Sequence, residues 1–504
     1  MANIAVLDIG KTNKKVFIYD QEFRLLDQSF ASFPADETGP VHLERIEEQC
    51  DWFLDRLRKL SQLFDIQVIS VTTHGATWVG VGEGASLALP VIAYSTEPGD
   101  DFRRVFSEKY GDASELYRQL STPNFGALVC LGRGIAFARD HFPEKFRDIR
   151  SILCFPQYFG FLLTGRTVAE CTYVGCHTYL WNFATRKWSF MVDLMGIRDL
   201  LPTRVGRPAD VLGTISGEIA SVTGLARQTL VTYGIHDSNA SLLPFLLREN
   251  SPFVLVSTGT WCVAMVPTKD TFLTDEERGR NAFLNCDAFG NPVKTTLFMG
   301  GAEHDTWWGA IQQATGATDY PPCDMQLTAS ILEEADTFIF PGVMPGSGPF
   351  PKSVSRLWAK GKEVTLQNIL NRREFPSELA NPARLYVVLN IGLAIQTSEQ
   401  LRGVGVTDGM PIFVEGGFRL NETYCLLLAS LFPGSRVMRT NLTEATALGA
   451  ALIGASALKH CDLRSLRDSF QIDSVPVEHR PLPQALRYRD AYLGQIMKEA
   501  NHKP

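Results

Sequence analysis

The stretch Val231–Phe245, VTYGIHDSNASLLPF, decides how the chain folds. An apolar run ends at Gly234, a single aspartate follows at Asp237, and small and apolar residues then continue at helical spacing. Such a pattern favours a buried strand that turns directly into a helix. The sequence therefore predicts that Asp237 is a lone carboxylate in a strand-to-helix turn near the middle of the chain.

Two chemical roles suit Asp237. Aspartate is a favoured N-cap residue, and Ser238 and Asn239 in the first turn fit a cap. A cap leaves the second carboxylate oxygen free, and the helix dipole keeps the group ionised. An ionised carboxylate can accept a proton from a substrate hydroxyl. We therefore expect Asp237 to act as a general base, with or without a capping role.

Two Gly/Thr-rich hairpin turns lie on either side of this stretch in the sequence. The first, DIGKTNKK at 8–15, belongs to a predicted antiparallel meander of strands at Ile4–Asp8, Lys15–Tyr19 and Phe23–Phe30. The second, STGTW at 257–261, lies inside a predicted hairpin over Phe253–Val266. Two copies of one device, roughly half a chain apart, predict two related domains that face each other across a cleft.

The turns have the composition of phosphate-binding loops, because backbone N–H groups in Gly-rich turns commonly meet phosphate. In the first turn, Thr12 can donate to a phosphate oxygen, Lys15 or Lys11 supplies positive charge, and Asp8 can hold Mg²⁺ through water. The Gly-rich turn EGGFRLN at 415–421 can admit an adenosine or serve only as helix-entry geometry. The plainer interpretation of the first turn is a polar hairpin with solvated lysines, and that of STGT is an ordinary β-turn. The chain has no GxxxxGK[ST] run.

Further polar residues follow a predicted short strand at Val68–Val71. His74 stands at the carboxyl end of that strand, where ligands bind in open α/β sheets, or is a loop histidine bonded to backbone. A strand is also predicted at Pro90–Tyr94. The segment TEPGDDFR at 96–103 runs into a helix start, where Asp100 or Asp101 caps the helix or bonds sugar hydroxyls.

The bulk composition narrows the class of protein. A chain of 504 residues predicts two or three domains. A formal charge of −7 gives no basic footprint, so no nucleic-acid partner is expected. The ten scattered cysteines lack zinc-like spacing and predict reduced, mostly buried thiols in a cytoplasmic protein. No signal-peptide layout and no membrane span are expected. The oligomeric state stays open, with a homodimer as one arrangement.

The order of these pieces resembles the FGGY family of carbohydrate kinases, within the actin/Hsp70/hexokinase class, over about residues 5–460. The motifs that carry the resemblance are DIGKTNKK (8–15), THG (73–75), LTG (163–165), RKW (186–188), LGTISGEIA (212–220), GIHD (234–237), STGT (257–260), EGGFRLN (415–421) and EATALGAAL (444–452). The resemblance implies an α/β fold of two actin-like (ribonuclease H-like) ATPase domains with an interdomain cleft. The implied units are 1–247 for sugar and base, 253–460 for ATP, and 461–504 as a helical extension.

The resemblance also implies ATP and Mg²⁺ as cofactors and a free ketose or polyol as substrate. By matching position, Asp237 is the catalytic base and, with Asp8, a metal residue. The residues implied for the nucleotide are Asp8, Gly10, Thr12, Lys15, Gly259, Thr260, Gly416, Gly417 and Asn421. Those implied for the sugar are His74, Gly75, Asp101, Arg103 and Asp237.

Some residues depart from the family pattern. These departures bear on which sugar is the substrate and not on the type of reaction. Lys11 replaces a small hydroxyl residue, the loop at 93–103 only approaches the usual aromatic–acid–Arg pattern, and MGGAEHDTW at 299–307 is unlike the common members. The loop sequences are most similar to those of kinases of L-rhamnulose and L-fuculose. In this chain, Trp78 and Phe125 either contact the methyl group of a deoxy-sugar or belong to the core. A catalytically silent sugar-binding regulator and an ATPase acting on protein are the competing hypotheses.

Overall fold

The computed structural model describes residues 2–371, 381–478 and 482–500. Its first sheet has the order β11-β12-β4-β1-β2-β3, with β13 paired to β4. The predicted N-terminal meander is confirmed, because β1–β2 and β2–β3 are antiparallel, whereas β4 runs parallel to β1. The strands are β1 Ala2–Ile9, β2 Asn13–Tyr19, β3 Leu25–Ser32, β4 Asp65–Thr73, β11 Val211–Thr214, β12 Leu230–Thr232 and β13 Ile235–His236.

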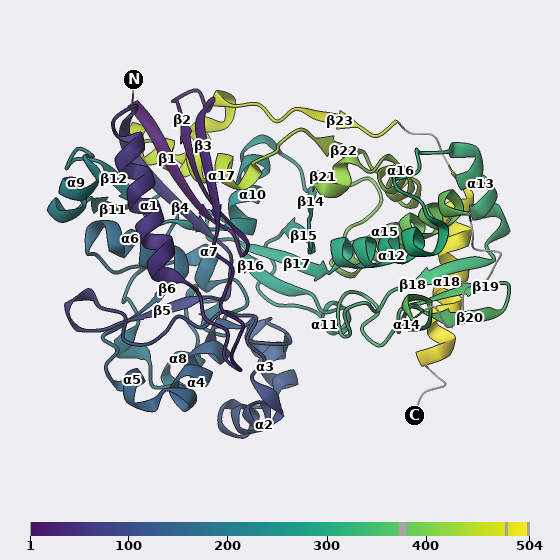
Figure 1. The fold of residues 1–504 in the computed structure, drawn as a ribbon, viewed down its shortest axis with the longest axis horizontal. Coiled ribbons are helices and arrows are strands. Elements are labelled where there is room, and N and C mark those ends of the chain that lie inside the picture. Colours follow the sequence, from purple (N-terminus) through teal and green to yellow (C-terminus); the bar gives the residue numbers. More distant parts are fainter. Residues whose placement is uncertain (1, 372–380, 479–481, 501–504) are drawn as a thin grey trace.

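A second sheet repeats this plan. Its order is β16-β17-β15-β14-β21-β22-β23, with an antiparallel hairpin followed by parallel strands, as in the first sheet. The predicted duplication is therefore confirmed at the level of topology (Figure 1). The strands are β14 Val254–Thr258, β15 Cys262–Pro267, β16 Phe283–Cys286, β17 Pro292–Phe298, β21 Ile412–Gly416, β22 Val437–Thr440 and β23 Ser474–Pro476.

Helices cover both faces of the first sheet. This is required because most side chains of β1 are apolar and buried, and they point alternately to the two faces. Successive side chains of a strand point to opposite faces. Ala5 and Leu7 join the core that includes α1 (Ile46–Leu60), whereas Ile4 and Val6 pack with α10 (Asp237–Arg248) and α17 (Ala445–Lys459). A sheet that is buried on both faces holds the ends of its strands rigidly. The candidate site lies at these strand ends.

The helix α17 lies within the predicted second unit by sequence but packs on the first sheet. It contacts β1, β4 and α10. Its approach to α10 is very close, since a Cβ on Gly449 would lie 1.9 Å from the carbonyl oxygen of Ala240. The predicted units 1–247 and 253–460 divide the chain by sequence order. In the structure, α17 of the second unit packs on the sheet of the first.

The chain passes between the two sheets at 249–253, again at 441–444, and back at 470–473. These passages are bonded to one another. The Arg467 guanidinium donates to the carbonyl oxygen of Arg248 (3.1 Å) and to Asn250 (2.9 Å), and the Asn441 amide donates to the carbonyl oxygen of Asp473 (2.8 Å).

A smaller lobe is inserted between β4 and β12, at the lower left of Figure 1. The strand predicted at Pro90–Tyr94 is wrong, since the segment contributes only an isolated bridge between Leu43 and Ile92. The main elements of the lobe are β5 Trp78–Val81, α2 Gly99–Tyr110, α3 Ala113–Leu120, α4 Leu131–His141, α5 Pro143–Arg147, β6 Ser151–Cys154, α6 Phe155–Thr164, α7 Cys171–Val174 and α8 Phe190–Leu194. The helix α9 (Gly217–Thr223) follows β11.

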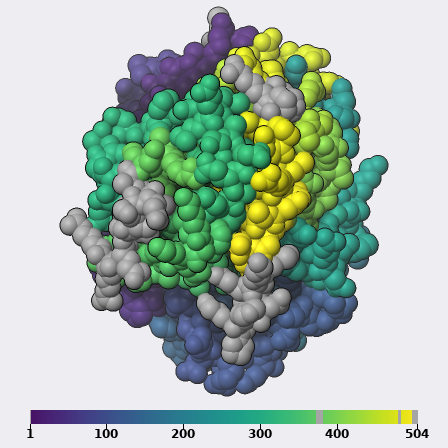
Figure 2. Space-filling model, turned by 90° about the vertical axis from the view of Figure 1, so that its right-hand side faces the viewer, coloured from purple at the N-terminus to yellow at the C-terminus, as the bar shows by residue number. Residues whose placement is uncertain are grey.

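The second half ends in α18 (Gln484–Ala500), which packs against α13 (Met325–Glu334) and lies across the face shown in Figure 2. The predicted C-terminal helix is therefore confirmed. In the part of the chain that the structure describes, no helix is long and apolar enough to cross a membrane. The other helices and strands of this half are α11 Asp275–Gly279, α12 Gly300–Thr315, β18 Thr337–Phe340, β19 Arg356–Ala359, β20 Lys362–Thr365, α14 Leu366–Leu370, α15 Pro382–Gly403 and α16 Glu422–Leu431.

Candidate active site

Asp237 is the first residue of α10 and directly follows β13, which pairs in parallel with the end of β4. The strand-to-helix turn is thus as predicted. Its Oδ1 accepts hydrogen bonds from the Ser238 amide (2.6 Å) and hydroxyl (3.3 Å). The predicted N-cap role is wrong, because His236 holds the N-cap position and Asp237 is already helical.

The carboxylate of Asp237 combines partial exposure with an altered acidity. One third of its side chain (33%) is exposed. Burial of the carboxyl group raises the pKa of Asp237, and interaction with His74 partly opposes this effect. A carboxylate with a raised pKa is a stronger base than a free aspartate, which suits proton abstraction near neutral pH.

The first hairpin brings Asp8 and Lys15 to the same place. They are paired across β1 and β2. Burial raises the pKa of Asp8 to about 7, Lys15 opposes the shift, and the charges of Asp237 and Glu444 add to it. The Lys15 ammonium bonds Glu444, which directly precedes α17, at 2.8 Å. The charges of both Lys15 and Asp237 therefore act on Asp8.

Two adjacent lysines allow a matched test of this hairpin. Lys15 is partly exposed (29%), whereas the fully buried Lys14 donates to the carbonyl oxygens of Gly10 (3.1 Å) and Lys11 (3.0 Å). We expect Lys15→Met to weaken MgATP binding on the order of 10- to 100-fold, the worth of a charged hydrogen bond, with little change in thermal stability. We expect Lys14→Met to lower the melting temperature, because the turn loses its internal donor. Calorimetric titration and thermal unfolding measure the two effects, and equal behaviour of the two variants contradicts the assignment.

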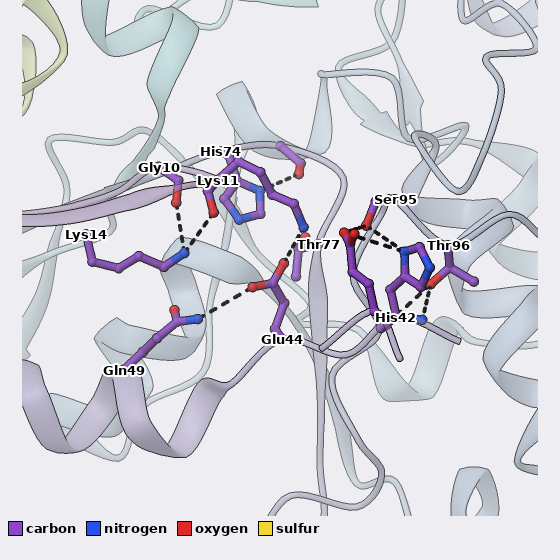
Figure 3. A network of polar contacts seen from close by, with 12 residues as sticks. Gly10, Lys11, Lys14, His42, Glu44, Gln49, His74, Thr77, Ser95 and Thr96 are labelled. Atoms are coloured by element: carbon purple, nitrogen blue, oxygen red, sulfur yellow. Dashed lines mark hydrogen bonds and ion pairs between the residues drawn. The ribbon is translucent and has the colours of Figure 1, made fainter. Parts of the chain in front are cut away.

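Lys11 has a different partner, although the sequence left Lys11 and Lys15 as alternative phosphate ligands. Its ammonium bonds the buried Glu44 at 2.9 Å and lies 4.7 Å from the ring centroid of Tyr94. Figure 3 shows this network, with Glu44 between Lys11 and Gln49 and with His74 beside it. The structure thus pairs Lys11 with Glu44 and leaves Lys15 as the lysine that acts on Asp8.

The second turn and the Gly-rich turn at 415–421 lie against each other. The Thr258 hydroxyl accepts from the Phe418 amide (2.9 Å). Gly416 has φ +78°, and a Cβ there would stand 1.8 Å from the Thr258 carbonyl oxygen, so only glycine fits. Gly259 and Thr260 are exposed at the tip of the hairpin. The structure thus brings Gly259, Thr260, Gly416 and Gly417 together at one edge of the second sheet.

The N-terminus of α12 belongs to this group and was not predicted as part of it. A Cβ on Gly301 would lie 2.2 Å from the Gly259 carbonyl oxygen. The helix has no side-chain cap at Met299, and the amides of Gly300 and Gly301 face the buried Cys262 thiol. The signal in the sequence was the pair Gly300–Gly301 between a strand pattern and a helix pattern, which we treated only as a departure from the family.

Asn421 is engaged within the protein. It caps α16 by accepting from the Tyr424 amide (3.0 Å), and it donates to Asn390 (2.7 Å) and to the Tyr386 hydroxyl (3.3 Å). The ring of Tyr386 stacks on the exposed ring of Tyr320 at a centroid distance of 5.6 Å. Asn421 therefore links the Gly-rich turn to an exposed aromatic surface.

The sugar-side residues His74 and Gly75 lie beside Asp237. The His74 Nδ1 bonds the Gly75 carbonyl oxygen (3.0 Å), and burial lowers the pKa of His74 to about 4, so the ring is neutral at neutral pH. A Cβ on Gly75 would lie 2.6 Å from Nε2 of His236 and 3.1 Å from Cε1 of His177. Gly75 thus makes room for two further histidine rings.

Those two histidines were missed by sequence reasoning. His236 Nδ1 lies 3.4 Å from Asp237 Oδ1, and the rings of His177 and His236 are 6.2 Å apart. Among the described residues, His74 Nε2 and the Nδ1 atoms of His177 and His236 are buried without a hydrogen-bond partner. Burial lowers the pKa of His177 to about 4 and of His236 to about 3. Lone histidines far apart in sequence carried no local signal for this cluster.

Asp101 and Arg103 lie on α2, at the lower edge of Figure 1 and away from α10. The Asp101 carboxylate is fully exposed and faces Arg104 at 3.6 Å, whereas Arg103 pairs with Asp100 and Glu97. The predicted cap at Asp100 or Asp101 is wrong, because both residues are inside the first turn. The structure does not bring this pair to the histidines, and their sugar-binding role stays a prediction.

Trp78 is a core residue, whereas Phe125 is placed at the site. Trp78 is 4% exposed and packs near Phe146, with ring centroids 6.5 Å apart. Phe125 lies edge-on to His177 at 5.8 Å and to Phe283 of the second sheet at 5.5 Å. An apolar ring therefore borders the histidine cluster.

Comparison with known proteins defines the class. The model of the FGGY family of carbohydrate kinases, N-terminal domain, matches residues 3–244, and that of the carbohydrate kinase FGGY C-terminal domain matches residues 250–462. Together the two family models cover most of the chain. The chain belongs to the FGGY family of carbohydrate kinases.

Relatives and solved structures agree with this assignment. The chain is 28% identical to a rhamnulokinase of Enterococcus faecalis over 41% of each chain, and 28% identical to that of Oceanobacillus iheyensis over 64% of each. These matches thus span from under half to just under two thirds of the length of those relatives. A carbohydrate kinase of Novosphingobium aromaticivorans shares the fold, with a TM-score of 0.80, 24% identity and 99% of both chains covered. The match to a xylulose kinase of Lactobacillus acidophilus covers 100% of this chain and 98% of that one, at 17% identity and a TM-score of 0.79. The predicted two-domain actin-like fold is confirmed.

Proposed function

We propose that this chain transfers the γ-phosphoryl group of ATP to a hydroxyl of a free ketose or polyol, with Asp237 as general base. The observation that carries the proposal is the partly exposed carboxylate of Asp237, with its raised pKa, beside Asp8 and Lys15. Phosphoryl transfer depends mainly on positioning and charge neutralisation, so a base, a cation and clamping amides suffice.

The base step follows from the hydrogen bonds of Asp237. Ser238 holds Oδ1 with its amide and hydroxyl, which leaves Oδ2 to accept the proton of the acceptor hydroxyl. The neutral rings of His74, His177 and His236 offer ring nitrogens to the other hydroxyls of the acceptor. A buried nitrogen without a partner costs free energy that a substrate hydroxyl recovers, which favours binding of a polyhydroxylated molecule.

The best candidate acceptors are a ketopentose or a 6-deoxyketohexose such as L-rhamnulose or L-fuculose. Two observations support this choice. Curated relatives are rhamnulokinases, and the apolar ring of Phe125 lies 5.8 Å from the ring of His177, where a deoxy-sugar methyl group can pack. A catalytically silent regulator is disfavoured, because the base, Asp8 and both turns are present.

The nucleotide is proposed to bind at the glycine cluster of the second half. Gly259 and Thr260 contact the phosphates, and Gly416 and Gly417 admit the adenosine. The exposed ring of Tyr320 offers a surface on which the adenine stacks. On the other side of the site, Gly10, Thr12 and Lys15 contact the γ-phosphate.

The donor set fits Mg²⁺. Asp8 and the residue two before Asp237 both pair with Thr72 at the end of β4, and the charge of Asp237 raises the pKa of Asp8. Mg²⁺ prefers a few carboxylate oxygens and several waters. Asp8 and Asp237 would hold the ion. When bound, Mg²⁺ neutralises negative charge on the phosphates.

Metal affinity is expected to depend on pH through Asp8. Because the pKa of Asp8 is raised to about 7, protons compete with Mg²⁺ below that pH. Titration of the nucleotide-free protein should show affinity rising up to about tenfold per pH unit from about pH 5 to 7, then levelling off. Asp8→Asn should abolish this dependence. An affinity that is flat over this range would remove Asp8 from the metal site.

The test of the proposed function is ADP release with MgATP over a panel of ketoses and polyols. Strong stimulation by one or a few sugars supports the kinase and names the acceptor. Sugar binding by calorimetry without ADP release with any sugar favours the regulator instead. L-Rhamnulose and L-fuculose should be compared with L-ribulose and D-xylulose, so that the effect of the methyl group is measured directly.

A further inference from the structure

A second cluster of potential metal ligands lies beside Asp237. Cys176, His177 and His236 each place one ligand atom within 4.8 Å of the others, and all three are buried. Cys176 and His177 follow α7, whereas His236 ends β13. The two elements are 60 residues apart in sequence, so the fold itself assembles the cluster.

The cluster contains polar atoms that the described protein does not satisfy. The exposed fractions are 3% for Cys176, 9% for His177 and 4% for His236. Within the described ranges, Nδ1 of His177 and Nδ1 of His236 have no hydrogen-bond partner. A buried unpaired nitrogen is costly, and a bound ligand or ion is one of the few explanations for keeping two of them side by side.

The surroundings hold both histidines in place. The His236 amide donates to the Thr172 hydroxyl (3.1 Å), which itself donates to the buried Glu170 (2.7 Å). The His177 ring lies edge-on between Phe125 (5.8 Å) and Phe283 (5.9 Å). These contacts fix the main chain at His236 and border the His177 ring on two sides.

The ligand types define the metal. One thiolate and two imidazoles select zinc-class ions, whereas Mg²⁺ takes oxygen ligands. In a tetrahedral zinc site the ligand atoms stand roughly 3.3–3.6 Å apart, given metal–ligand distances of about 2.0–2.3 Å. The observed limit of 4.8 Å therefore requires the side chains to close by roughly 1 Å. The three ligands leave a fourth position open.

We propose that Cys176, His177 and His236 bind one Zn²⁺-class ion, and that the bound ion blocks the acceptor side of Asp237. On binding, the Cys176 thiol loses its proton to solvent and forms the metal–sulfur bond, with no change in oxidation state. His236 directly precedes Asp237, and its Nδ1 is 3.4 Å from Asp237 Oδ1, so an ion bound to His177 and His236 withdraws both rings from the sugar. This second part rests on the proposed function, whereas metal binding does not.

Cobalt(II) is the probe for the metal site, because its thiolate charge-transfer and tetrahedral d–d absorption report the ligands directly. The full chain should bind one Co²⁺ with both signals in excess Mg²⁺, and Zn²⁺ should displace it. Cys176→Ser should lose the thiolate signal, and His177→Asn, which suits the left-handed backbone at φ +40°, should weaken binding about 10- to 100-fold.

Cys461→Ser is the control. Cys461 is a partly exposed thiol that lies far from Cys176 in the sequence and does not belong to the cluster. This substitution should leave the spectrum unchanged. Absence of a thiolate signal in the wild-type chain overturns the proposal, and so does a signal that survives Cys176→Ser or disappears in Cys461→Ser. The histidine variant decides the case if Cys176→Ser fails to fold.

Enzyme assays test the second part. Zn²⁺ should inhibit competitively with the sugar, and Cys176→Ser should relieve the inhibition while keeping turnover near the wild-type value. Normal turnover by the zinc-loaded enzyme overturns the blocking role. Absence of turnover with every sugar overturns the proposed function together with this competition, and the cobalt spectrum then decides on the metal site alone.

Discussion

Asp237→Asn is expected to lower kcat by a factor on the order of 10²–10⁴ while MgATP still binds. The amide keeps the shape of the side chain, so the hydrogen bond from the Ser238 amide to Oδ1 (2.6 Å) can persist. What is lost is the oxygen that accepts the proton of the acceptor hydroxyl. Steady-state kinetics with the best sugar of the panel measures the effect, and calorimetry checks the nucleotide.

The control for Asp237→Asn is Asp275→Asn, which removes an equally negative but almost fully exposed carboxylate on α11. This control should change kcat by less than about twofold, as expected for an exposed side chain. A kcat near the wild-type value in Asp237→Asn would show that the base is another residue, and the proposed chemistry would then fail. A loss of nucleotide binding in the same variant would instead assign Asp237 chiefly to the metal.

Gly449→Ala is expected to destabilise the protein by about 2–4 kcal/mol, at the upper end for an overpacked core. The new Cβ would lie 1.9 Å from the carbonyl oxygen of Ala240 and 2.6 Å from its carbonyl carbon. Both are backbone atoms, so α10 and α17 must separate. Because Asp237 begins α10, any folded variant should also lose turnover. Denaturant unfolding and kinetics measure these two losses.

Gly309→Ala provides the matched control for this change. Gly309 is inside α12, and a Cβ there meets nothing within 4 Å. It should therefore stabilise the helix by about 0.5–1 kcal/mol, because alanine loses less backbone entropy than glycine. Equal stability changes in the two variants would show that the helix contact at Gly449 is looser than the structure has it.

The local features of the fold were predictable because they are written in short stretches. The hairpins at 8–15 and 257–261 follow from strand alternation interrupted by glycine, and the structure confirms both. The error at Pro90–Tyr94 arose because a short apolar segment beside proline gains strand geometry only if a partner strand is available. Here the segment makes one bridge, between Leu43 and Ile92.

The tertiary features were beyond the sequence. The Ala/Gly-rich sequence of α17 carried no information on which sheet the helix covers, and the helix packs on the first sheet. The N-cap interpretation of Asp237 was wrong because pairing of β13 with β4 extends the strand through His236, so that residue takes the cap position. His177 and His236 meet only in the folded chain, since Gly75 leaves the space that both rings fill.

The bonded passages at 249–253, 441–444 and 470–473 have a mechanical consequence. Two bodies joined through a single connection can twist and slide in any direction, whereas parallel connections that are tied together permit rotation about one shared axis. Arg467 and the backbone of Asn441 bind these connections to each other. Opening and closing of the two halves should therefore be a rotation about one axis. A pair of distance labels, one on each half, would record this rotation as a change in their separation when nucleotide is added.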